Sequence, residues 1–204
     1  MTVTKIEPIT KTKYKVYLDE QFAFVLYKGE LSRYQVKEKR ELSEEDYQEI
    51  RNKIILKRAK LRALHLLNTM GRTETQLREK LRQGGYPVDI IEETVTYVKS
   101  FGYVDDLEYA RNFILNRKHK KSRKELCIAL CRKGIDQGKI EEVFEECYGE
   151  NDPKVAIETI FRKKNYHPDT ADEIEKKKML AYLINKGFRY EDVRQLIQVS
   201  KWNA

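Results

Sequence analysis

The spacing of apolar residues changes along the chain, from a period of two near the start to the period of an α-helix. Residues 14–18 and 22–26 are two short runs rich in aromatic and β-branched residues, and three polar residues separate them. This pattern predicts a β-hairpin. Ser43, followed by three acidic residues, predicts a helix start, because serine caps a first turn and the helix dipole favours acids there. The apolar positions of this helix recur at Ile50, Ile54, Leu61, Leu64 and Leu67, and Gly71 ends it.

Start and stop signals divide the rest of the chain into short helices. Thr73 with Gln76 and Ser122 with Glu125 form capping boxes, in which each side chain bonds the backbone amide of the other residue. The other predicted starts are Asp105 with Glu108 as a similar box, Pro87 in a first turn, Asp152 as a cap before Pro153, and Asp169 as a cap. Predicted ends lie at Gly85, Gly102, Gly134 and Gly187.

One apolar pattern occurs three times after residue 55. When Gly85, Gly134 and Gly187 are aligned, apolar residues coincide at five further positions. These are Leu77, Leu126 and Met179; Leu81, Leu130 and Leu183; Tyr86, Ile135 and Phe188; Ile91, Ile140 and Val193; and Val95, Phe144 and Ile197. Each copy predicts a helix, a glycine stop and a second helix, with one more helix before the pair.

These patterns predict a mainly α protein, in which an N-terminal β-hairpin segment precedes three tandem three-helix repeats. The hairpin and a helix take up residues 1–54, and the repeats take up residues 55–104, 105–151 and 152–204. Tandem repeats bury a seam between neighbours and leave an extended surface. Such an array explains why 36% of the residues are charged.

The composition of the 204 residues excludes several classes of protein. Forty-one basic and 33 acidic residues give a net charge of +8, and the 40% of hydrophobic residues argues against a disordered polyelectrolyte. No apolar run approaches the ~18 residues of a bilayer-crossing helix, and the first residues lack the apolar core of a secretory signal. The three cysteines are an odd number that suggests no disulfide framework. We expect a cytoplasmic protein with reduced thiols and no membrane partner.

No pattern predicts a catalytic, nucleotide or cofactor site. Asp105 and Asp106 are able to bind a metal or share a proton, but a helix cap explains them and no third carboxylate or histidine lies at a ligand spacing. Cys127 and Cys131 lie one helical turn apart and offer two zinc ligands, with His119 and Cys147 at a distance in sequence; the alternative is a core role, since no second pair completes the site. We expect no enzyme activity, no metal and no cofactor.

Basic residues form clusters that recur along the repeats. Residues 111–133 carry nine basic groups and one acid, whereas residues 135–152 carry seven acids and one lysine. Recurring clusters suit a phosphate backbone or an acidic filament, and the alternative is a solvated helix face. The candidate binding residues are Arg58, Arg62, Arg72, Arg78 and Arg82; Arg117, Lys118, Lys120, Lys121, Arg123, Lys124 and Lys133; and Arg162, Lys163, Lys164, Lys176, Lys177 and Lys178. Tyr97, Tyr109 and Tyr182 lie at core spacing and are assigned to the core rather than to base stacking.

The segment SFGYVDDLEYARNFI at residues 100–114, with KGI at 133–135 and KGF at 186–188, resembles the RecX family of bacterial regulatory proteins. The similarity covers nearly the whole chain, although the first repeat has Gly84-Gly85 in place of Lys-Gly. The resemblance implies an elongated, curved array of three-helix repeats that binds the groove of the RecA recombinase filament. It implies lower ATPase, strand-exchange and coprotease activity of RecA, and hence modulation of recombination and DNA repair in the SOS response.

The leading hypothesis is a non-enzymatic, monomeric regulator whose basic faces lie in the groove of a RecA filament and contact single- and double-stranded DNA. The alternative is a stand-alone DNA-binding protein that recognises no particular sequence and has no filament partner.

The repeat array predicts a molecule that is more extended than a globule. A compact protein of this length has a radius of gyration of about 17 Å. Small-angle X-ray scattering should give a clearly larger value, and a value equal to that of a globule would contradict the array.

Overall fold

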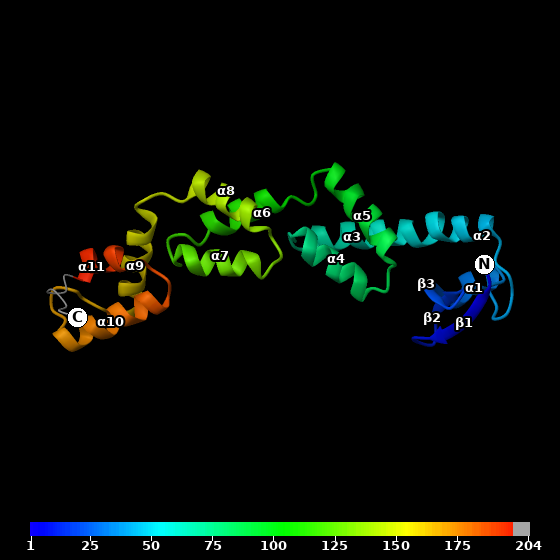
Figure 1. Ribbon diagram of the computed structural model, residues 1–204, viewed down its shortest axis with the longest axis horizontal. Coiled ribbons are helices and arrows are strands. Elements are labelled where there is room, and N and C mark those ends of the chain that lie inside the picture. The colour runs from blue at the N-terminus through cyan, green and yellow to red at the C-terminus, as the bar shows by residue number, and fades with distance from the viewer. Residues whose placement is uncertain (198–204) are drawn as a thin grey trace. The chain divides into compact units, whose positions relative to one another are not determined.

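The computed structural model describes residues 1–197, which form an N-terminal antiparallel sheet followed by helices (Figure 1). The chain divides into two compact units, Met1–Asp105 and Asp106–Ala204, with separate apolar cores. The predicted mainly α fold with an N-terminal β segment is confirmed. The repeat boundaries and the elongated, curved shape stay predictions, and residues 198–204 of the third predicted repeat lie outside the described residues. Within residues 1–197, none of the helices combines the length and apolar character that crossing a bilayer demands.

Three strands form the sheet in the order β1 (Val3–Pro8), β2 (Lys13–Leu18) and β3 (Gln21–Tyr27), all antiparallel. The predicted hairpin is β2 with β3, and its turn residues Asp19 and Glu20 have φ values of 45° and 67°, as a two-residue hairpin turn requires. Strand β1 was not predicted. Its sequence VTKIEP alternates only weakly between apolar and polar residues, although it pairs with the next strand along the chain, with Pro8 opposite Tyr14.

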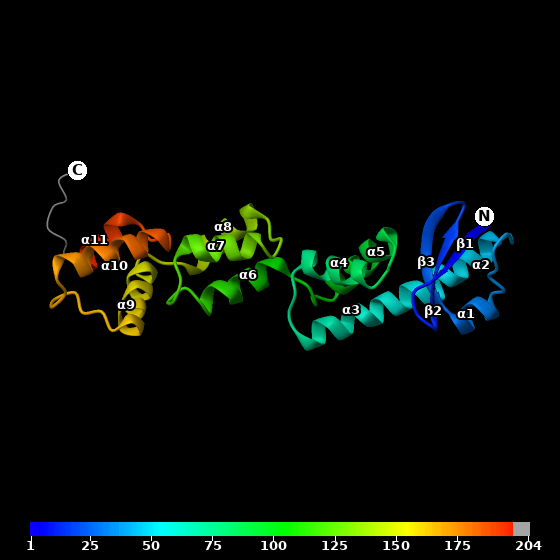
Figure 2. The ribbon, with the colours of Figure 1, turned by 90° about the horizontal axis from the view of Figure 1, so that it is seen from below.

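After α1 (Lys28–Arg33), one continuous helix runs alongside the sheet (Figure 2). It comprises α2 (Glu44–Glu49), the π-helical segment η1 (Ile50–Leu56) and α3 (Lys57–Thr69). The Ser43 hydroxyl caps it as predicted, accepting a hydrogen bond from the Asp46 amide at 3.0 Å. Phe24 and Leu26 of the sheet share one apolar core with Ile50 and Ile55 of the helix.

The apolar face predicted for this helix is wrong at Leu61, whereas the predicted Leu64 and Leu67 are half-buried against an apolar core. Leu61 is 59% exposed, whereas Ala59, Ala63 and Leu66 are buried. A π-helical turn holds more residues than an α-helical one, so it rotates every later side chain relative to the start of the helix. The two buried alanines are also invisible to a pattern that counts only large apolar residues.

The repeats are confirmed as helices in the predicted order. They are α4 (Glu74–Gln83), α5 (Val88–Ser100), α6 (Asp106–Leu115), α7 (Arg123–Cys131), α8 (Gln137–Cys147), α9 (Asp152–Lys164), α10 (Glu173–Asn185) and α11 (Tyr190–Ile197). Gly85, Gly134 and Gly187 have φ values of 78°, 80° and 87°. The aligned Leu81, Leu130 and Leu183 are fully buried. The aligned pattern therefore identifies the core of each repeat.

Three predicted helix starts need correction. Pro87 is the N-cap of α5 rather than a first-turn residue, and Asn151 rather than Asp152 is the N-cap of α9. Helix α10 begins after Asp172, whose carboxylate accepts from the Glu175 amide at 2.7 Å. Asp169 was the predicted cap, but the reciprocal capping box of Asp172 with Glu175 satisfies two orphan amides instead of one.

Gly187 tolerates a side chain poorly for two reasons. Its φ is +87°, and an added Cβ would lie 2.7 Å from Cβ of Lys124. The left-handed backbone costs an L-residue about 1–2 kcal/mol, and overpacking adds about 1–3 kcal/mol. Gly187→Ala should therefore lower the free energy of unfolding, measured by urea titration with circular dichroism.

Two other glycines separate these causes. Gly102 has a φ of +69° with no atom near its Cβ position, so Gly102→Ala should show only the backbone cost. Gly71 has neither feature, and Gly71→Ala should change stability by less than about 0.5 kcal/mol. Equal effects of the substitutions at Gly187 and Gly102 would contradict the crowding at Lys124.

Candidate functional site

The predicted acidic and cysteine pairs do not form a metal site. Among residues 1–197, no group of three or more His, Cys, Asp or Glu side chains is placed to hold an ion. Asp106 is buried in the first turn of α6, with Nζ of Lys139 at 4.0 Å. Cys127 is half-buried, and burial raises the pKa of its thiol, with the neighbouring Cys131 adding to the effect. Cys131 is exposed, so the core role holds in part for Cys127 and is wrong for Cys131.

The arginines of the first repeat mostly make contacts inside the protein. Arg58 forms an ion pair with Glu30 and donates to the Val25 carbonyl at 3.1 Å. Arg78 bridges Glu92 at 3.0 Å and Glu74 at 3.1 Å. The Glu92 hydrogen bond is the largest of the influences that raise the pKa of Arg78. The guanidinium groups of Arg58 and Arg78 therefore hold helices and strands together.

Arg82 and Arg72 make fewer contacts inside the protein than Arg58 and Arg78 do. Arg82 pairs with Glu79 at 2.7 Å on the exposed side of α4, and Nε of Arg72 donates to the Leu66 carbonyl at 3.4 Å. Arg62 is exposed and forms no ion pair with a described side chain. It is the member of the predicted first cluster with the least compensated charge.

The predicted cluster of residues 117–124 separates into internal and outward-facing members. Nζ of Lys118 lies 3.0 Å from the Asp152 carboxylate, and Arg123 pairs with Glu141. The guanidinium of Arg117 lies over the Phe113 ring at 4.2 Å. The exposed members that form no ion pair within the described residues are Arg117, Lys120, Lys121 and Lys124, and of these the three lysines also lie over no aromatic ring of the described residues.

The third cluster divides in the same way. Lys164 lies over the Tyr182 ring at 4.2 Å, and Lys176 pairs with Glu173 at 3.8 Å. Arg162 donates to the Thr159 hydroxyl at 3.2 Å. Lys133 of the second repeat lies 5.7 Å from the ring centres of Tyr109 and Phe113. Besides Lys164, the exposed lysines of this cluster that form no ion pair within the described residues are Lys163, Lys177 and Lys178.

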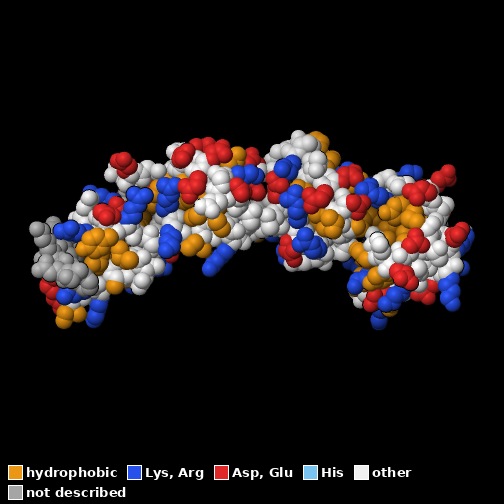
Figure 3. Space-filling model, viewed as in Figure 1, with side chains coloured by type: hydrophobic (Ala, Val, Ile, Leu, Met, Phe, Trp, Pro, Cys, Tyr) orange, Lys and Arg blue, Asp and Glu red, His pale blue; other side chains and the backbone are white. Residues whose placement is uncertain are grey.

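The clusters are therefore less basic than the sequence alone indicates. Acidic and basic side chains interleave on the face drawn in Figure 3, and many predicted cations have carboxylate partners from other helices. Most of the uncompensated candidates, namely Lys120, Lys121, Lys124, Lys163, Lys177 and Lys178, belong to the second unit. Tyr97, Tyr109 and Tyr182 are half-buried against the cores, as predicted, although basic side chains cover their rings.

Two polar contacts join the second and third repeats. The Ser122 hydroxyl donates to the Lys186 carbonyl at 2.6 Å, and Nζ of Lys186 lies 3.1 Å from the Glu125 carboxylate. The N-terminus of α7 thus meets the C-terminus of α10, an arrangement in which opposite ends of two helix dipoles face each other. Sequence reasoning identified Ser122 and Glu125 only as a capping box.

Asp152 is the centre of a further set of contacts between these repeats. Its carboxylate accepts hydrogen bonds from the Gly149 amide at 2.7 Å and from Lys118 at 3.0 Å, and lies 2.9 Å from Nε2 of His119. Burial by itself raises the pKa of Asp152, but the Gly149 amide, Lys118 and His119 outweigh it, so the pKa lies below its ordinary value. Asp152 therefore connects the end of α6 to the start of α9.

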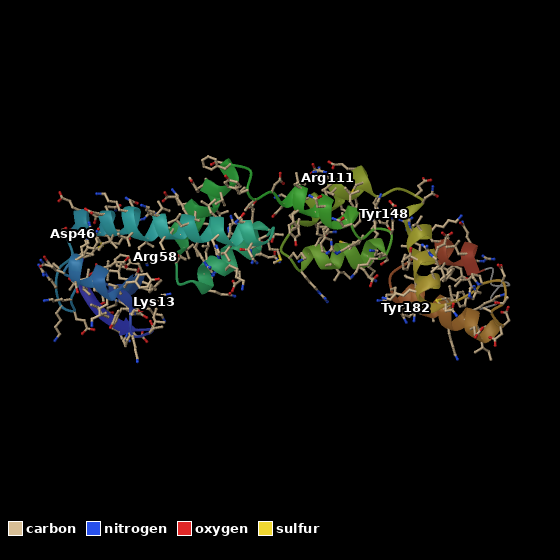
Figure 4. The ribbon with its side chains drawn as sticks, turned by 180° about the vertical axis from the view of Figure 1, so that it is seen from behind. Lys13, Asp46, Arg58, Arg111, Tyr148 and Tyr182 are labelled. Atoms are coloured by element: carbon tan, nitrogen blue, oxygen red, sulfur yellow. The ribbon has the colours of Figure 1, made fainter. Side chains whose placement is uncertain are left out.

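Sequence reasoning also missed a groove beside these contacts. It has a volume of about 740 Å³ and lies between α7, the loop before α9 and the start of α11. Arg123, Lys124 and Arg189 line it together with Ile128 and Phe188. Tyr148, labelled in Figure 4, also lines it, and burial raises the pKa of Tyr148 to about 12.

The Asp152 contacts predict a specific acid sensitivity. A carboxyl group whose pKa is lower in the folded protein stabilises the fold above its unfolded pKa, and this contribution is lost as the pH falls through the folded value. Asp152→Asn should lower the free energy of unfolding at neutral pH by about 1.5–3 kcal/mol. The difference from wild type should shrink below about pH 4.

Urea titrations over a range of pH values measure this effect. Asp169→Asn is the matched control, because Asp169 is exposed and has no ion pair within the described residues. A constant difference between wild type and Asp152→Asn at all pH values would contradict the role of the Asp152 charge.

Comparisons with known proteins cover nearly the whole chain. The family model for the first three-helix domain of RecX matches residues 59–97. The regulatory protein RecX of Caldanaerobacter subterraneus subsp. tengcongensis is 31% identical over 203 residues, covering 98% of this chain and 100% of that protein. The regulatory protein RecX of Clostridium acetobutylicum is 26% identical and covers 97% of this chain and 95% of its own.

Solved structures show the same fold. A crystal structure of regulatory protein RecX has a TM-score of 0.60 at 24% identity, covering 97% of this chain and 98% of that one. The structure of RecX from Lactobacillus salivarius has a TM-score of 0.58 at 22% identity, covering 70% of this chain and 94% of that one. Because the Caldanaerobacter protein is 31% identical over 98% of this chain, the chain belongs to the RecX family of regulatory proteins.

Proposed function

We propose that this chain is a non-enzymatic, monomeric regulator that acts in the cytoplasm by binding the RecA nucleoprotein filament in its groove. Binding lowers the ATPase, strand-exchange and coprotease activities of RecA and so modulates recombination and DNA repair. The observation that carries the proposal is the end-to-end similarity to a regulatory protein RecX. The residue assignments rest on the charges and exposures of the second unit.

The exposed lysines are the residues best suited to a polyanionic partner. Lys120 and Lys121 precede α7, and Lys124 lies in its first turn. The positive end of a helix dipole adds to their charge there. Because these lysines have no carboxylate partner within the described residues, they keep their full attraction for DNA phosphates or for acidic groups of RecA. Paired residues such as Arg78 and Arg123 would first have to break internal contacts.

An exposed aromatic pair supports a contact with protein as well as with DNA. Phe101 and Tyr103 are 59% and 57% exposed, and their rings are stacked with centres 6.1 Å apart. Tyr97 lies edge-on to Phe101 at 5.0 Å. Neighbouring exposed aromatic side chains are typical of protein interaction sites. This pair belongs to the SFGYVDD segment on which the family resemblance rests.

Regulation by such a ligand depends on a difference in affinity. A protein that binds two states of a filament equally well shifts neither of them. We therefore assign the effect to contacts that exist only when RecA protomers are assembled in one arrangement on DNA.

The second candidate is a stand-alone DNA-binding protein without sequence preference. The same uncompensated lysines favour it. It predicts that DNA affinity falls steeply with salt concentration, according to the number of phosphates neutralised. It also predicts that RecA is affected only through competition for DNA.

Reversing two of the exposed charges tests the proposal. Lys120→Glu with Lys121→Glu should raise the concentration needed for half-inhibition of the DNA-dependent RecA ATPase roughly tenfold, because two attractive contacts become repulsive. Thermal stability should stay nearly unchanged, since both side chains are exposed.

The matched control is Lys37→Glu with Lys39→Glu, which changes the net charge equally at exposed lysines outside the predicted clusters. The control should inhibit as wild type does. Full inhibition by the Lys120 and Lys121 variant would refute the assignment of these residues.

A further inference from the structure

A pocket in the first unit has a lining whose charged residues are all basic. It has a volume of about 470 Å³ and lies between the sheet, the long helix and the loop after α4. Its charged residues are Lys13 and Lys15 of β2, Arg58 of α3 and Arg82 near the end of α4. The other lining residues are Ile9, Val25, Tyr27, Ile55, Gln83, Gly84, Gly85 and Tyr86. Its volume falls in the range of small-ligand sites.

The sheet places the two lysines on one face. In the register of β2 and β3, Lys13 lies opposite Tyr27 and Lys15 lies opposite Val25. Side chains alternate between the faces of a strand, so Lys13 and Lys15 lie on the face opposite to the buried Val16. Nζ of Lys13 is 5.4 Å from the centre of the Tyr27 ring. Neither lysine forms an ion pair with a described side chain.

Arg58 holds the other side of the pocket in place. It pairs with Glu30, donates to the Val25 carbonyl and lies 4.6 Å from the centre of the Tyr27 ring. Lys13 of the sheet and Arg58 of the adjacent helix are both labelled in Figure 4. Arg58 is fixed by its contacts, whereas Lys13 is exposed and able to move from the Tyr27 ring to a ligand.

The carboxylates around the pocket are engaged elsewhere. Glu30 pairs with Arg58, and Glu79 pairs with Arg82. Glu7, opposite Lys15 on β1, lies 3.6 Å from Lys5 and accepts from the Tyr17 hydroxyl at 3.1 Å. Lys13 is therefore the least compensated cation of the pocket, whereas Lys15 forms no ion pair but is also attracted by Glu7. The pocket favours an anionic ligand.

Gly84 and Gly85 form part of one wall of the pocket. At these two positions the first repeat departs from the Lys-Gly pattern of the other repeats. A Cβ on Gly84 would lie 3.0 Å from the Tyr86 ring, and one on Gly85 would lie 3.1 Å from Cγ2 of Val25. The two glycines let the loop approach Tyr86 and the sheet closely. They also leave that wall without a side chain that would fill the space between the cations.

We propose that this pocket binds single-stranded nucleic acid, with a phosphate at Lys13 and Lys15 and a base against the Tyr27 ring. Cations beside an aromatic ring match the alternating phosphates and bases of a single strand. An acidic peptide would satisfy the lysines but would leave the ring without a planar partner. The site is distinct from the lysines of the second unit and requires no RecA.

Fluorescence anisotropy with a labelled oligodeoxythymidine, measured over a range of salt concentrations without RecA, tests the proposal. Lys13→Gln with Lys15→Gln should reduce the slope of log affinity against log salt concentration by about 0.7, since the one phosphate contact that the two lysines share contributes about that much on a single strand. Tyr27→Leu should weaken binding roughly tenfold and leave the slope unchanged.

The control Lys37→Gln with Lys39→Gln removes the same charge outside the pocket and should leave the slope at its wild-type value. Circular dichroism establishes that each variant is folded. Equal slopes for the pocket variant and the control would overturn the proposal. If the pocket variant loses its binding to labelled polyglutamate but keeps its binding to oligodeoxythymidine, the pocket is an acidic-peptide site and the proposal is overturned as well. Because RecA is absent, either result leaves the proposed filament role standing.

Discussion

The burial of one leucine in the middle helix of each repeat is the contact on which the rest of the structure depends. Leu81, Leu130 and Leu183 are fully buried, and each lies four residues before a left-handed glycine. Helices of about ten residues are marginal in water, so packing rather than helix propensity keeps them folded. Once the apolar stripe of each repeat is buried, the remaining faces are available for charged residues, which explains how a stable fold carries 36% of them.

Arginine and lysine have different roles in this chain. Several arginines connect helices: Arg51 pairs with Asp89 at 2.8 Å, Arg78 with Glu92 at 3.0 Å and Arg111 with Glu146 at 2.7 Å. A planar guanidinium bonds a carboxylate at two points, and this suits it to fixing one helix against another. Many lysines, such as Lys120 and Lys163, project into solvent instead. The net charge of +8 therefore does not show how the basic residues divide between those that are paired inside the fold and those that remain available to a partner.

The sequence predicted the regular parts of the fold and missed the features that have no clear local signal in the sequence. The three glycine turns, the capping boxes at Thr73 and Ser122 and the β2–β3 hairpin follow from local rules. Strand β1 was missed because its sequence alternates only weakly between apolar and polar residues, and Leu61 of α3 was assigned to the wrong face because a π-helical turn has no clear sequence signal. In the candidate site, the sequence spacing indicates ion pairs between residues one helical turn apart, such as Arg82 with Glu79. Pairs such as Arg123 with Glu141 became visible only in the structure.

The central claim is that this chain acts on the assembled RecA filament rather than on DNA alone. The most direct measurement is the ATPase rate of a filament formed on single-stranded DNA before the chain is added, with DNA in excess over the added chain. The account predicts that amounts of the chain far below the RecA concentration lower the rate. An unchanged rate, with inhibition appearing only when the chain is added before RecA in amounts that saturate the DNA, would contradict it.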